Sequence, residues 1–94
     1  MSDNDFTHLR LKISGKVQGV GYRAYVVAEA TRLGVDGWIQ NRADGTVEAL
    51  VSGPNAAVEK LVGLCMKGHA NAVVKDVEMY KAEAPGAKGF RERP

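Results

Sequence analysis

Several features that mark common protein classes are missing from this sequence of 94 residues. It has a single cysteine, Cys65, so no disulfide can form within the chain. No apolar run approaches the length of a transmembrane helix. Residues 1–7 are polar and lack the apolar segment of a signal peptide. These absences predict a reduced protein of the cytoplasm.

Charge of one sign is not concentrated anywhere. The net charge is +2, and lysine and arginine are scattered rather than gathered in a long run. This balance alone does not argue for a nucleic acid or a membrane as partner. The apolar fraction of 45% and the charged fraction of 26% are ordinary for a globular protein. The length predicts one domain, residues 1–94, with one core and a loose end at residues 1–6.

The sequence also lacks a recognisable metal-binding motif or an arrangement typical of a catalytic nucleophile. His8 has no second histidine, cysteine or carboxylate at ligand spacing, and no Ser–His–Asp arrangement is recognisable. Cys65 lies on the apolar side of a predicted helix, where a free cysteine packs as a core residue. We therefore expect no metal and no cofactor.

The periodicity of apolar residues predicts the secondary structure. The predicted elements are, in order, a strand over 8–14, a helix over 22–33, a hairpin of strands over 35–42 and 46–52, a helix from Pro54 to Gly68, a strand over 72–83 and a short edge strand over 90–93. Pro54 suits the first helical position. Alternation along the fourth strand requires a bulge near Lys75 and Asp76.

The order β-α-β-β-α-β in so short a chain predicts an α+β fold of the ferredoxin-like, split β-α-β kind. Two helices would cover one face of an antiparallel sheet, with a possible short fifth strand. Asn41 shares the core-facing side of its strand with Gly37 and Ile39, at the strand's end. Because this fold hosts enzymes, RNA binders and metal carriers, it does not identify a function.

The segment Gly15–Arg23, which reads GKVQGVGYR, joins the first strand to the first helix. Glycines permit positive φ, so backbone N–H groups of such a turn can converge on an anion together with the helix N-terminus. Arg23 lies in the first helical turn, where the helix dipole disfavours a cation. This placement suggests a negatively charged partner, although a flexible connection with a solvated arginine explains the glycines equally well.

Two motifs together resemble the acylphosphatase family. The first is the segment Gly15–Arg23, and the second is Gly37–Glu48, which reads GWIQNRADGTVE. They match the family's Gly-x-Val-Gln-Gly-Val-x-Phe/Tyr-Arg loop and its Gly-x-x-x-Asn-x-x-Asp-Gly-x-Val-Glu hairpin. The resemblance extends from Leu9 to Arg93. Residues 68–73 depart from the family's usual Gly-Pro-rich entry to the fourth strand, which bears on stability and leaves both motifs intact.

The resemblance implies a hydrolase that cleaves acyl phosphates to carboxylate and inorganic phosphate. Arg23 would bind the phosphoryl group, and Asn41 would hold the attacking water. The backbone N–H groups around Arg23 would cradle the same oxygens; these belong to Gln18, Gly19, Val20, Gly21, Tyr22 and Arg23. The substrate would be a small molecule, with no nucleic acid or membrane as partner, and the protein would be a monomer.

Asparagine has no useful pKa as a general base, so the implied mechanism depends on positioning and charge stabilisation. Two alternatives stay open. One is a non-catalytic module that binds an anionic ligand or RNA through Arg23, Lys12, Lys16 and Arg42. The strands offer mainly Trp38 and Tyr80 for base stacking, which makes RNA the weaker choice. The other is a regulatory domain cut from a longer chain.

Overall fold

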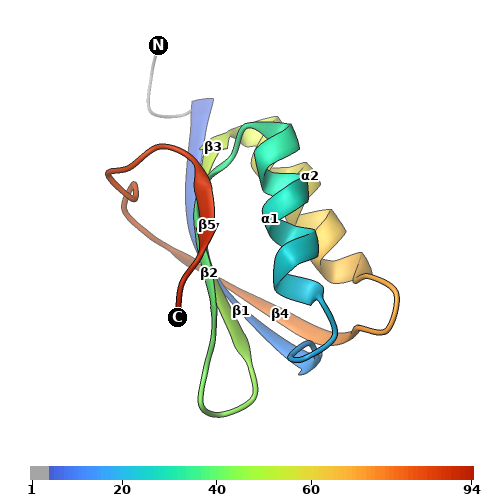
Figure 1. Ribbon diagram of the computed structural model, residues 1–94. Helices are drawn as coiled ribbons and strands as arrows, with labels where there is room; N and C mark the ends of the chain where they lie inside the picture. Colours follow the sequence, from blue (N-terminus) through green and yellow to red (C-terminus); the bar gives the residue numbers. More distant parts are fainter. Residues whose placement is uncertain (1–4) are drawn as a thin grey trace.

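The computed structural model describes residues 5–94 and shows a sheet with two helices packed on one face (Figure 1). The elements are β1 (Phe6–Lys16), α1 (Tyr22–Leu33), β2 (Asp36–Asn41), β3 (Val47–Pro54), α2 (Asn55–Lys67), β4 (Val73–Lys81) and β5 (Phe90–Glu92). The strand order is β4-β1-β3-β2-β5. This arrangement confirms the predicted ferredoxin-like fold, and the bounds of α1 are those that the periodicity predicts.

The fifth strand forms and pairs with β2, so the sheet is not antiparallel throughout. Strands β1 to β4 pair antiparallel, whereas β5 runs parallel to β2, with Trp38 opposite Arg91 and Ile39 opposite Glu92. A loop over 82–89 carries the chain back to the edge of β2 (Figure 1). This pairing covers backbone groups that would otherwise leave β2 as an open edge.

The core lies between the sheet and the helices, where the alternation predicts it. Leu11 and Ile13 of β1 are fully buried, as are Val26 of α1 and Leu61 of α2. Met66 is an exception, because its side chain is 55% exposed although it continues the apolar spacing of α2. No helix among residues 5–94 is long and apolar enough to cross a membrane.

Two predicted boundaries were wrong. Phe6 is not part of a loose end: it begins β1 and pairs with Pro54 of β3, while residues 1–4 lie outside the described residues. Pro54 is the residue before α2 rather than its first helical residue, with ψ of 142°. Its fixed φ of −55° suits both positions, and pairing with Phe6 keeps its backbone extended.

The predicted bulge in β4 is confirmed. Ser14 pairs with Asp76 and the next residue, Gly15, pairs with Val74, so Lys75 has no opposite residue on β1. The extra residue lets Val74 and Val77 both pack against the core despite their odd spacing.

Candidate functional site

The loop between β1 and α1 adopts a backbone that only its glycines accommodate easily. Gly19 and Gly21 have φ of 72° and 78°, in the left-handed region, and Gly21 is the N-cap of α1. No side chain caps this helix end, and its first turn contains no acidic residue. The first N–H groups of α1 therefore keep the capacity to bind an external anion.

Arg23 lies beside this loop, at the beginning of α1. Its Nη1 is 3.3 Å from Oε1 of Glu92 on β5. The two side chains and the loop line a small cavity of about 130 Å³, whose lining residues are Val17, Gly19, Gly21, Tyr22, Arg23, Ala24 and Glu92. The structure thus provides the negative partner expected for Arg23, and this partner is a carboxylate of the protein itself.

Asn41 is the last residue of β2, and the hydrogen bonding of its side-chain carbonyl is unusual. Its Oδ1 is buried and accepts no hydrogen bond from any residue in the part of the chain that the structure describes. Buried polar atoms are nearly always paired, because an unpaired one costs about 1–3 kcal/mol. An exception of this kind indicates a site where a water or ligand completes the hydrogen bonding.

The side chain of Gln18 joins the glycine loop to the hairpin that follows Asn41. Its Nε2 donates to the backbone carbonyls of Arg42, at 2.8 Å, and Thr46, at 2.9 Å. Arg42 is the next residue after Asn41, so this pair of hydrogen bonds fixes the loop next to the end of β2. The sequence pattern predicts a role for the backbone N–H of Gln18 but not this role of its side chain, because both acceptors are distant in the sequence.

The side chain of Tyr22 has a structural role. Only the backbone N–H of this residue is predicted to belong to the phosphate cradle. The ring is buried, and its hydroxyl donates to the carbonyl of Cys65 on α2 at 2.8 Å. Burial raises the pKa of this hydroxyl far above its usual value. The bond ties the first residue of α1 to the second helix and so holds the loop end of α1 in place.

Cys65 is buried and is not a nucleophile of this site. Burial raises the pKa of its thiol to about 11, so the thiol stays protonated near neutral pH. It therefore packs as the core residue that the sequence predicts.

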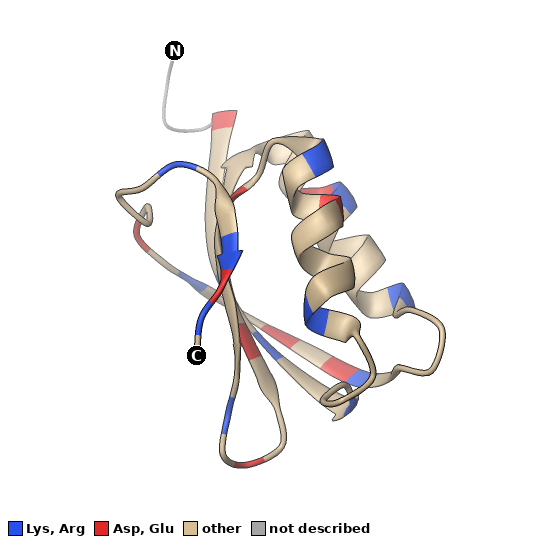
Figure 2. Ribbon diagram, in the orientation of Figure 1, with Lys and Arg blue, Asp and Glu red and all other residues tan. Residues whose placement is uncertain are grey.

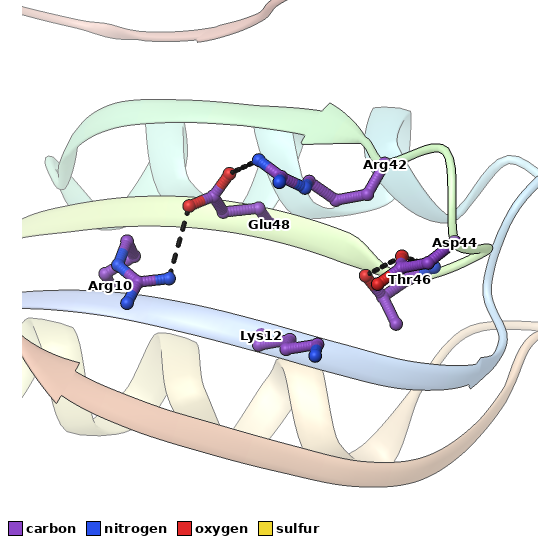
Figure 3. Close-up of a pocket in the computed structure, with 6 residues that line it drawn as sticks. All are labelled: Arg10, Lys12, Arg42, Asp44, Thr46 and Glu48. Carbon is purple, nitrogen blue, oxygen red and sulfur yellow. Dashed lines mark hydrogen bonds and ion pairs between the residues drawn. The ribbon is translucent and has the colours of Figure 1, made fainter.

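The opposite face of the hairpin carries a cluster of charged residues around Glu48 (Figure 3). Its Oε1 accepts hydrogen bonds from Arg42, at 2.7 Å, and Gln40, at 3.0 Å, while Arg10 pairs with Oε2 at 3.3 Å. Burial alone would raise the pKa of Glu48, but these donors lower it overall. The cluster borders a cavity of about 150 Å³, and most of its charges pair with one another.

Arg23 does not converge with the other basic residues of the alternative binding module that line a cavity. Arg23 lies on the helix-covered side with Glu92, whereas Lys12 and Arg42 line the cavity on the uncovered side of the sheet. The charged residues are distributed over both sides of the molecule (Figure 2). Among residues 5–94, no group of three His, Cys, Asp or Glu side chains is arranged to hold a metal ion.

Comparisons with known proteins agree on one family. The family model described as acylphosphatase matches residues 9–92. A curated acylphosphatase of Rhodospirillum rubrum is 50% identical over 86 residues, which cover 92% of this chain and 94% of that protein.

Two solved structures extend the likeness to three dimensions. The acylphosphatase of Bacillus subtilis superposes with a TM-score of 0.89 at 33% identity, covering 93% of this chain and 98% of that one. The acylphosphatase of Coxiella burnetii gives a TM-score of 0.90 at 29% identity, covering 99% and 98%.

Proposed function

The chain belongs to the acylphosphatase family, and we propose that Arg23, Asn41 and the loop over 18–23 perform the reaction from which the family takes its name. The protein is a hydrolase that cleaves the bond between the carboxyl and phosphoryl groups of acyl phosphates. Its products are a carboxylate and inorganic phosphate. The alternative of a non-catalytic binding module has no support from the comparisons.

Phosphate binding falls to Arg23 and the loop. A guanidinium presents two N–H groups that match two phosphate oxygens, and it stays charged at any working pH. Backbone N–H groups of Gln18, Gly19, Val20, Gly21, Tyr22 and Arg23 complete the cradle around the same oxygens. The uncapped N-terminus of α1 supports this assignment, because it adds a favourable field for an anion.

Asn41 positions the attacking water, and the observation that carries this role is its buried, unpaired Oδ1. A water that donates a hydrogen bond to this oxygen directs a lone pair away from Asn41 and toward the bound phosphoryl group. Gln18 holds the loop next to the residue that follows Asn41, which supports the proximity that the step requires. The side chain of Asn41 takes no proton in this scheme.

The proton of the attacking water passes to an oxygen of the substrate's own phosphoryl group. A carboxylate is a good leaving group, so the departing oxygen needs little acid catalysis. Catalysis then consists of orientation and of stabilising the charge on the equatorial oxygens of a loose transition state. We expect neither a metal nor a cofactor to take part.

Glu92 holds Arg23 before substrate arrives. The ion pair spans 3.3 Å, and both side chains are partly exposed. Little free energy is therefore lost when a phosphate dianion replaces Glu92 as the partner of Arg23. The carboxylate orients the guanidinium toward the cavity, and a phosphoryl group that offers two oxygens competes favourably with it. We place this step in the binding of substrate and in the release of phosphate.

The test is hydrolysis of benzoyl phosphate with and without a metal chelator. We expect turnover that the chelator does not change and that inorganic phosphate inhibits competitively. Arg23→Ala should lose both turnover and phosphate binding, and Arg23→Lys should restore neither because it lacks the planar fork. Arg32→Ala, at an exposed arginine of the same helix, is the matched control and should behave as the parent. An absolute requirement for Mg²⁺ would contradict the proposed mechanism.

We further propose that the protein acts as a cytoplasmic monomer on small acyl phosphates. The matched segment covers 94% of the Rhodospirillum rubrum protein, which supports the same class of substrate for this chain. Sedimentation at several protein concentrations tests the monomer, with a concentration-dependent increase in mass as the contrary result.

A further inference from the structure

A cavity of about 300 Å³ lies on the side of β5 that faces away from Arg23. Its walls come from β2, β5 and the loop over 82–89, and its lining residues are Gly37, Trp38, Pro85, Ala87, Arg91 and Arg93. Alternation along β5 separates this cavity from the proposed active site. Glu92 turns toward Arg23 on the helix side, so its neighbours Arg91 and Arg93 turn to the other side.

Two arginines line this cavity together with the indole of Trp38. Arg91 is the direct partner of Trp38 in the pairing of β2 with β5, and the guanidinium carbon of Arg93 is 4.2 Å from the centre of the Trp38 ring. Within residues 5–94, neither arginine forms an ion pair with a carboxylate. Two like charges that share one face of a strand repel each other, and an anion between them would remove that repulsion.

The chemistry of the cavity defines the kind of anion. The guanidinium groups of two arginines that line one cavity match the oxygens of a phosphate monoester. Pro85, Ala87 and the indole of Trp38 offer an apolar wall next to them, which suits an organic group attached to the phosphate. The carboxylate of Asp36 accepts a hydrogen bond through Oδ1 from the backbone N–H of Gly89, which holds it at the loop over 82–89.

We propose that Trp38, Arg91 and Arg93 form a second binding site, for a small organic phosphate, on the face of β5 opposite the active site. Arg91 and Arg93 hold the phosphate, and the wall formed by Trp38, Pro85 and Ala87 contacts the organic group. The site goes beyond the proposed function and does not depend on it, since none of its residues touches the cavity of Arg23.

Trp38 is the only tryptophan of the chain, so its fluorescence reports on this cavity alone. The experiment titrates phenyl phosphate into Arg23→Ala, which removes the proposed active-site contribution. We expect a saturable change in Trp38 emission, with heat of binding in calorimetry. Adding R91A and R93A should weaken binding at least tenfold. Inorganic phosphate lacks the aromatic group and phenol lacks the phosphate, so each should bind more weakly than phenyl phosphate.

The matched control removes two positive charges elsewhere. Arg23→Ala combined with K60A and K67A, at exposed lysines of α2, has the same net charge as the triple arginine variant and should bind phenyl phosphate like Arg23→Ala alone. Equal weakening in both triple variants would show general attraction of charge and overturn the proposal. So would an absence of binding heat with Arg23→Ala, or binding that survives R91A and R93A.

Turnover provides a separate check. R91A with R93A in the parent background should hydrolyse benzoyl phosphate at the parental rate, because these residues lie outside the proposed active site. A loss of turnover with an unchanged melting temperature would place them in the active site and contradict a second site. Since the binding titrations use Arg23→Ala, a failure of the catalytic assignment does not alter their result.

Discussion

Asn41 and Glu48 lie close together on the β2–β3 hairpin but on opposite faces of the sheet. The two oxygens of Glu48 pair with Arg10 and Arg42 (Figure 3), and one of them also accepts a hydrogen bond from Gln40. Asn41 has a buried oxygen that no described residue satisfies. The same short hairpin thus contains one polar side chain whose bonds are complete and one whose bonds are not.

We interpret the difference as that between a structural role for Glu48 and the catalytic role proposed for Asn41. A buried group with complete hydrogen bonding stabilises the geometry around it, whereas an incomplete one persists at a cost in stability. Such a cost is retained where the group is needed for binding or catalysis. On this comparison, substitution of Asn41 should affect activity and substitution of Glu48 should affect stability.

The largest expected effect is that of Asn41→Ala on turnover. We predict that kcat falls by about 10²–10³, the range typical for losing one group that acts in the transition state. Inhibition by inorganic phosphate should persist, because Arg23 and the loop remain. The melting temperature should stay the same or rise, since a buried acceptor without a partner disappears. Asn71→Ala, at an exposed asparagine, is the control; a full rate in Asn41→Ala would end the water-positioning role.

Gln18→Ala tests whether the link between loop and hairpin matters for catalysis. Two side-chain hydrogen bonds disappear, so we expect the free energy of unfolding to fall by about 1–2 kcal/mol. We also expect kcat to fall by about tenfold or more, since small displacements of positioned groups slow reactions strongly. Steady-state kinetics and chemical denaturation measure the two effects.

A conservative variant sharpens the test of Gln18. Gln18→Glu keeps the size of the side chain but cannot donate to the carbonyls of Arg42 and Thr46. It should therefore be at least as impaired as Gln18→Ala. Parental kinetics in Gln18→Glu would show that the two hydrogen bonds do not position the loop for catalysis.

Glu48→Gln should reduce stability less than Gln18→Ala does, and it should leave kcat near the parental value. Arg10 and Arg42 are about half exposed, so their pairs with Glu48 contribute weakly, and we expect a loss of about 1 kcal/mol. Chemical denaturation at neutral pH measures it. A large drop in kcat without loss of stability would reverse the roles inferred from the comparison.

The smallest expected effect is on the pH dependence of stability, measured as the difference in free energy of unfolding between the parent and Glu48→Gln. Although burial opposes it, the donors around Glu48 lower its pKa below the usual 4.5 in the folded protein. The stabilisation is therefore complete above the unfolded-state pKa and is lost as pH falls through the folded-state pKa. The parent and Glu48→Gln should differ at neutral pH and converge in acid. A constant difference at all pH values would show that ionisation of Glu48 is not its source.

Local sequence patterns were sufficient for much of the fold. The spacing of Tyr22, Val26, Ala30 and Leu33 predicted α1 with its observed bounds, because a helix periodicity and a glycine C-cap are encoded within one segment. Alternation placed Asn41 on the core-facing side of β2, and the odd spacing in β4 predicted its bulge. Each of these features depends on residues that are neighbours in the chain.

Features that depend on distant residues were not predictable in this way. The bonds from Gln18 cross more than twenty residues of sequence, and the partner of Arg23 comes from the last strand. Nothing near Glu92 in the sequence indicates whether its strand pairs at all, or in which direction. Its parallel pairing with β2 brings together two segments that lie far apart in the sequence.

The sequence by itself determined the order of helices and strands, the glycine loop with Arg23, and the family to which both motifs point. These depend on local backbone preferences and on residue types at fixed spacing. Only the tertiary structure decided that Glu92 faces Arg23, that Gln18 ties the loop to the hairpin, and that the oxygen of Asn41 has no partner. Those properties exist only once distant segments share the same space, because hydrogen bonds and burial depend on distance in the fold.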